Sequence, residues 1–154
     1  MTSILSPKAR EILERLETRR DTRAPAELSS SEQVQLTVEA ALEKKAEFLK
    51  VLELAEVSDF TDHFLICSGT NERQVKAIAD SIQGLLIQAK IKPLHVEGYL
   101  HGRWVLLDYG GDMVIHVFHR EARSFYDLER LWSDAPDVTQ RYLGQATVAE
   151  ATAS

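Results

Sequence analysis

The chain has 154 residues, of which 44% are hydrophobic and 27% charged, a composition typical of one folded domain with short extensions. No apolar run approaches the roughly 18 residues of a membrane-spanning helix. The first 21 residues contain acidic side chains among their arginines, and transit peptides avoid acidic residues. We therefore expect a cytoplasmic protein.

The charge and the cysteine content narrow the partners and the chemistry. The formal net charge is −6, and residues 34–133 carry 11 basic and 15 acidic groups. An acidic core argues against DNA and against binding dominated by phosphate contacts, and it favours a basic protein as partner. Cys67 is the only cysteine, which excludes an internal disulfide, and its apolar neighbours indicate a buried side chain.

The N-terminal part predicts a helix over residues 7–20, with an apolar stripe that includes Ala9 and Ile12. A linker containing Pro25 should follow. We interpret residues 1–33 as a loosely attached extension, and the alternative is that they dock onto the domain.

The first half of the domain predicts a helix, two strands and a second helix. A capping box, either Ser29 with Glu32 or Ser30 with Gln33, should start a helix that runs to about residue 47. Strands are expected at 49–54 and 64–68. The clearest helix begins after the cap residue Asn71 and repeats apolar residues at three and four up to Ala89.

The second half predicts three strands and a helix. A short strand should lie at 94–97, and a hairpin should join strands 103–109 and 113–119. A last helix is expected from Ser124, with Phe125 on its apolar face. Residues 134–154 look disordered. The fold class is therefore α/β (α+β), with a single mixed sheet of about five strands and helices mainly on one face, and residues 34–133 form the domain.

Known catalytic patterns are missing. The five histidines lack metal-ligand spacing, and the Ser-Gly turn at 68–69 is not a nucleophile elbow. A nucleotidyltransferase needs paired carboxylates for its metals, whereas Asp80 and Asp108 each stand alone. We expect no catalytic residue, no metal and no cofactor. A nucleotidyltransferase-like enzyme or nucleotide-binding protein is the alternative.

The hairpin surface is the candidate partner site. With a three-residue loop at 110–112, Trp104, Leu106, Asp108 and His116 share one sheet face. A two-residue loop would turn His116 to the opposite face. A large aromatic beside a carboxylate and an imidazole suits a protein contact. The competing interpretation is that Trp104 closes the core and Asp108 supports the turn.

Several segments resemble the Iojap-like family of ribosomal silencing factors. They are residues 62–80 (DHFLICSGTNERQVKAIAD), 97–98 (EG), 104–110 (WVLLDYG), 116–118 (HVF) and 123–132 (RSFYDLERLW). Together they span most of the predicted domain. The family usually has Asp-Tyr-Gly-Asp in the hairpin, so Gly111 is an additional residue, and deleting it is expected to leave binding and stability nearly unchanged.

The resemblance implies a nucleotidyltransferase-like fold without the catalytic carboxylates. It implies binding to the large ribosomal subunit through its fourteenth protein, which blocks the small subunit and represses translation, with a further role in large-subunit maturation. Self-association into a homodimer is compatible with this function. The candidate partner-binding residues are Trp104, Leu106, Asp108, Tyr109 and His116.

Overall fold

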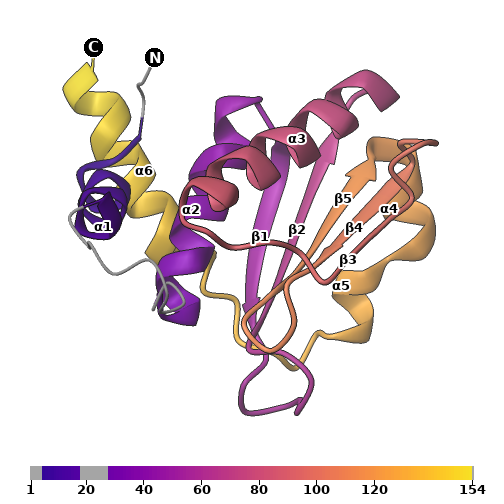
Figure 1. The fold of residues 1–154 in the computed structure, drawn as a ribbon. Coiled ribbons are helices and arrows are strands. Elements are labelled where there is room, and N and C mark those ends of the chain that lie inside the picture. The colour runs from indigo at the N-terminus through magenta and orange to yellow at the C-terminus, as the bar shows by residue number, and fades with distance from the viewer. Residues whose placement is uncertain (1–4, 18–27, 154) are drawn as a thin grey trace.

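A five-stranded mixed sheet organises the chain, in a computed structural model that describes residues 5–17 and 28–153 (Figure 1). The strands are β1 (Glu47–Glu53), β2 (His63–Gly69), β3 (His95–Glu97), β4 (Trp104–Asp108) and β5 (Val114–His119). Their order is β1-β2-β5-β4-β3. Only β2 and β5 run parallel, and the other pairs are antiparallel. The expected fold class is confirmed.

Two helices cover one face of this sheet. They are α2 (Ser30–Glu43) and α3 (Glu72–Gln88). Ser29 forms the capping box with Glu32, which settles the choice left open by the sequence, and Asn71 caps α3 as predicted. Helix α2 ends at Glu43, earlier than expected. Most of the buried hydrophobic residues gather between these helices and the sheet.

Phe48, just beyond the expected end of helix α2, is not part of an apolar helix face. It lies in β1 beside a bulge, with φ +50° and an exposed ring. The bulge adds a residue to the strand and turns the side chain outwards.

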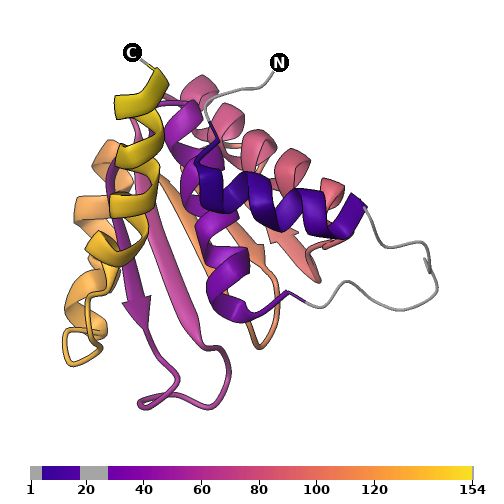
Figure 2. The same ribbon diagram turned by 90° about the vertical axis from the view of Figure 1, so that its left-hand side faces the viewer.

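Two further helices pack together at the β1 end of the molecule, α1 (Pro7–Glu17) and α6 (Thr139–Ala153) (Figure 2). The expected loose attachment of the N-terminal part is wrong for α1, because Ala9 and Ile12 are fully buried. The Ser6 hydroxyl and amide both donate to the buried Glu39 carboxylate of α2. The linker was predicted over residues 21–31; residues 21–27 lie outside the described residues, and Ser30 and Ser31 belong to α2 instead.

The C-terminal segment is ordered up to at least α6, contrary to the prediction of disorder. Tyr142 and Ala146, one helical turn apart, are buried. Before the helix, the Val138 amide donates to the Val51 carbonyl, and the Thr139 hydroxyl accepts from the Val51 amide. This segment therefore covers the outer edge of β1. Its composition of small and polar residues did not indicate this contact.

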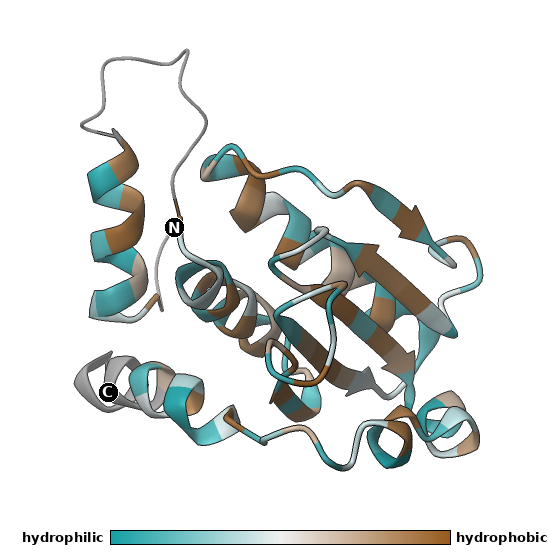
Figure 3. Cartoon of the chain, turned by 90° about the horizontal axis from the view of Figure 1, so that it is seen from below, coloured by the Kyte–Doolittle hydropathy of each residue, from teal (hydrophilic) through white to brown (hydrophobic). Residues whose placement is uncertain are grey.

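The second face of the sheet is only partly covered, by α4 (Arg120–Tyr126) and α5 (Leu128–Leu131) (Figure 3). The predicted start at Ser124 is wrong, because His119 caps α4 by accepting from the Glu121 amide. Asp127, in the left-handed region at φ 48°, separates the two helices. In the described part of the chain no helix is long and apolar enough to cross a membrane.

Candidate functional site

The β4–β5 hairpin has the register of a three-residue loop, as hypothesised from the sequence. Leu106 pairs with His116, and the Tyr109 amide donates to the Met113 carbonyl at 3.0 Å. Gly110, at φ +75°, supplies the left-handed residue of the loop. The register places His116 on the same face as Leu106.

Alternation along β4 divides its side chains between two environments. Trp104, Leu106 and Asp108 are half-buried on the side of α4 and α5. Val105 and Leu107 point to the other face and are buried in the core beneath α2 and α3. The aliphatic residues of β4 thus pack against the helices. We call the opposite side, with Trp104, Leu106 and Asp108, the mixed face, and it is partly exposed to solvent.

Tyr109 is separated from the other candidate site residues. It lies with the buried aliphatic set and is 6% exposed. Burial raises the pKa of its hydroxyl, which has no hydrogen-bond partner among the described residues. A partner docking on the α4 side of the sheet would not touch this ring.

Trp104 and His116 form the centre of the mixed face. The indole N–H of Trp104 donates to Nδ1 of His116 at 3.0 Å. The indole also lies against Phe118 and Tyr126, with ring centroids 5.0 Å and 4.6 Å away. Desolvation by burial lowers the pKa of His116 to about 4, so the imidazole is neutral at physiological pH. Trp104 therefore combines a packed inner edge with a partly exposed outer surface.

Asp108 has a local structural role and is still accessible. Its Oδ1 accepts from the Gly110 amide at 2.8 Å, which supports the hairpin turn. Its side chain is only half-buried, so Asp108 remains partly accessible to a partner. The two interpretations offered by the sequence, turn support and contact, are compatible at this position.

Strand β3 extends this surface to the edge of the sheet. Glu97 pairs with Leu106 and His95 with Asp108, so all four side chains lie on one face. Gly98, at φ +78°, allows the next turn to approach β4, because a Cβ there would lie 2.0 Å from the Trp104 carbonyl oxygen. This close approach explains why glycine follows Glu97 in residues 97–98, one of the segments that resemble the family.

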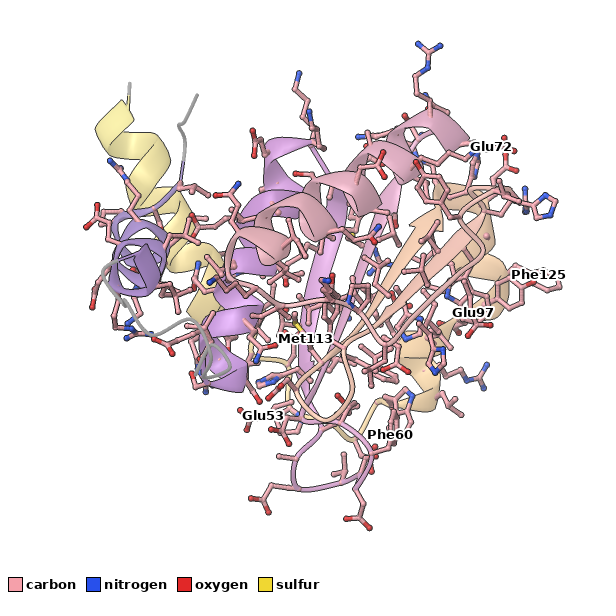
Figure 4. All side chains as sticks on the ribbon, in the orientation of Figure 1. Glu53, Phe60, Glu72, Glu97, Met113 and Phe125 are labelled. Atoms are coloured by element: carbon pink, nitrogen blue, oxygen red, sulfur yellow. The ribbon has the colours of Figure 1, made fainter. Side chains whose placement is uncertain are left out.

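Helix α4 adds two aromatic residues to this surface, Phe125 and Tyr126. Phe125 was expected in the core, but its side chain is 81% exposed and packs against Tyr126, with ring centroids 5.1 Å apart. Phe125 and Glu97 project from the same side of the molecule (Figure 4). We call this combined surface the open face. It comprises Glu97, Trp104, Leu106, Asp108, Phe125 and Tyr126.

The carboxylates that might have served an enzyme are not brought together. Asp80 lies on α3, which covers one face of the sheet, and its carboxylate accepts from the Tyr99 hydroxyl. Asp108 lies on the other face. In the described ranges, no three His, Cys, Asp or Glu side chains are grouped to hold a metal ion. The residues therefore do not fit the two-metal arrangement of nucleotidyl transfer.

A cleft of about 580 Å³ between β1 and α4 is lined by Lys50, Arg120 and Arg123. Its two arginines are already paired, Arg120 with Glu47 at 2.8 Å and Arg123 with Glu129 at 2.6 Å. The Arg123 guanidinium also donates to the Ser68 hydroxyl at 2.9 Å. The cleft is thus held together by its own ion pairs.

Known proteins resemble the chain over the sheet and its helices. A family model described as "Ribosomal silencing factor during starvation" (RsfS) matches residues 27–154. A ribosomal silencing factor RsfS of Halalkalibacterium halodurans is 45% identical over 111 residues, which cover 72% of this chain and 94% of that protein. The RsfS of Bacillus subtilis is 42% identical over 103 residues, 67% of this chain and 86% of that protein.

A solved structure agrees with these relatives. The crystal structure of a protein from Bacillus halodurans is 44% identical and superposes with a TM-score of 0.63, covering 70% of this chain and 97% of that one. The match to the family model includes every strand and the whole open face. The chain accordingly belongs to the family of ribosomal silencing factors, which are non-enzymatic ribosome-binding factors.

Proposed function

We propose that the chain docks through its open face on the fourteenth protein of the large ribosomal subunit, in the cytoplasm. Bound on the subunit-joining side, it sterically excludes the small subunit and represses translation. A role in maturation of the large subunit follows from the same attachment. Family membership supports the choice of the ribosome, and the composition of the open face supports a protein contact.

The observation that carries the proposal is the combination of exposed aromatic rings with carboxylates on one surface. Trp104 and Phe125 offer the anchors that dominate binding energy at protein interfaces. Glu97 and Asp108 lie beside them and give the surface negative charge. Ribosomal proteins that contact RNA are rich in basic residues, so the charges are complementary.

The chain is large enough to exclude the small subunit sterically. A standard interface buries about 800 Å² on each partner. The chain exposes 8790 Å², so most of it would project from the subunit after docking. The projecting part would include α2 and α3, which lie on the far side of the sheet.

The test is co-sedimentation with purified large subunits, with and without small subunits, for two matched variants. Phe125→Ala should lower affinity by about 2 kcal/mol, or roughly thirtyfold, if Phe125 is an anchor. Phe48→Ala is the control, because Phe48 is similarly exposed, at 75%, and lies in the edge strand β1, outside the open face. It should bind like the parent chain.

The site residues expected from the sequence are tested in the same experiment. Trp104→Ala should weaken binding at least as much as Phe125→Ala, whereas Tyr109→Phe should leave affinity unchanged because that ring is buried on the other side. Equal binding by all four variants would place the interface elsewhere. If the chain forms a homodimer through the open face, ribosome occupancy should rise less steeply with chain concentration than for a monomer, since a second copy and the large subunit compete for that face.

A further inference from the structure

The hydrogen bond between Trp104 and His116 fixes the protonation of the imidazole. An indole N–H can only donate, so Nδ1 of His116 must accept and carry no proton. In the neutral ring, the proton then lies on Nε2. That group is buried and has no hydrogen-bond partner among the described residues.

His116 is held rigidly by uncharged neighbours. It is 4% exposed, and the rings of Phe64 and Phe118 lie beside it at centroid distances of 4.9 Å and 6.2 Å. An unpaired buried donor lowers stability, so a phenylalanine of similar shape would suit this position about as well for folding alone. What the histidine adds is one acceptor aimed at Trp104.

We propose that His116 is a positioning residue, which fixes the indole of Trp104 in the orientation that the ribosomal partner binds. The inference rests on the proposed function. A tryptophan that is free to change rotamer loses that freedom on binding, and this loss weakens affinity. The hydrogen bond from one edge, with Phe118 and Tyr126 against the ring, restricts the indole before the partner arrives.

Two variants separate positioning from folding, because they alter stability and the acceptor in opposite ways. His116→Phe keeps an aromatic ring and removes the acceptor. Its free energy of unfolding should stay close to that of the parent chain, because removal of the unpaired Nε2–H offsets loss of the hydrogen bond from Trp104. Its affinity for large subunits should fall five- to tenfold. His116→Asn places a carbonyl oxygen near the position of Nδ1 but leaves a cavity. It should lose stability and, at temperatures where it is folded, bind within about twofold of the parent chain.

The indole resonances in a ¹⁵N–¹H spectrum provide a direct readout. The Trp104 signal should shift in His116→Phe as the hydrogen bond is lost, and it should remain near its original position in His116→Asn. Trp132, which lies against Phe64 at 5.4 Å, is the internal reference and should hardly move in either variant.

The results distinguish this inference from the proposed function. If affinity follows stability in both variants, or if His116→Phe binds like the parent chain while Trp104→Ala does not, His116 has a purely structural role and the inference is wrong. If Trp104→Ala itself binds normally, the assignment of the open face fails first.

Discussion

Burial of His116 in an uncharged setting links its protonation to folding. The pKa of the folded imidazole is about 4, below the ordinary value of 6.5, because desolvation disfavours the charged form. The unfolded chain therefore binds the proton more tightly. The contribution of the neutral His116 imidazole to the free energy of unfolding is therefore complete above pH 6.5, and it is lost as the pH falls towards 4.

The free energy of unfolding of the parent chain should thus decrease by about 2 kcal/mol more than that of His116→Phe when the pH is lowered from 7 to 5. Urea unfolding at the two pH values measures this difference. The other four histidines are the same in both proteins, so their contributions cancel. An equal decrease in both would show that His116 is accessible to protons in the folded state.

Single residues also mark where sequence reasoning ends. Alternation along β4 and the loop length were enough to place Trp104, Leu106 and His116 on one face. The exposure of Phe125 was not predictable, because it depends on the break at Asp127, where the backbone leaves the helical region. Periodicity assumes an uninterrupted helix, and it therefore assigned Phe125 to the core.

At the scale of elements, α1 is a docked helix whose contribution should be measurable. Ile12 is fully buried between α1 and its neighbours, so Ile12→Ala should lower the free energy of unfolding by about 2 kcal/mol. Glu11→Ala, on the exposed side of the same helix, is the control and should change it by less than about 0.5 kcal/mol. Thermal unfolding reports both, and equal values would mean that α1 adds nothing to stability.

The hairpin loop is tied to two other elements, which changes what its deletion should do. The Gly111 carbonyl accepts from the Asp62 amide at 2.9 Å, and the Asp112 carboxylate accepts from the Ser30 hydroxyl at 2.7 Å. Deleting Gly111 should cost about 1 to 2 kcal/mol through these bonds, where the sequence alone suggested no cost. Binding should persist, because Trp104 remains in the same strand.

Gly111→Ala is the matched control for that deletion. No atom lies within 4 Å of an added Cβ, and the φ angle of Gly111 is not in the left-handed region, so the alanine should be tolerated. Urea unfolding compares the two. A deletion as stable as the alanine variant would show that the loop contacts contribute little.

Strands and long helices were predictable from the sequence because their patterns are local. Strands β2 and β5 and helix α3 lie within one or two residues of their expected limits. The docking of α1 and α6 was not predictable, since their apolar residues are buried against one another, against α2 and, for α6, against β1. Such mutual burial is a property of the assembled fold.

For the whole molecule, the net charge of −6 predicts how binding should depend on salt. Attraction to a basic protein acts mainly on association, so raising the salt from about 50 to 500 mM should slow association up to about tenfold and change dissociation little. Stopped-flow mixing with labelled large subunits measures both rates. In Glu97→Gln the salt effect on association should be smaller, and Glu43→Gln, an exposed change on α2, is the control.

A fall of affinity with salt that is much steeper than this roughly tenfold change would contradict this picture. That behaviour arises when basic side chains displace counterions from nucleic-acid phosphates. It would mean that the chain binds ribosomal RNA directly, and that the acidic open face is not the main contact.

The position of α1 has a consequence for how the chain can change over time. This helix precedes the region shared with the family, which starts at residue 27, and it packs at the β1 end of the sheet. The open face begins at β4, three strands or roughly 14 Å further along. Mutations in α1 can adjust tolerance of heat without disturbing recognition of the ribosome, so selection can act on the two traits independently.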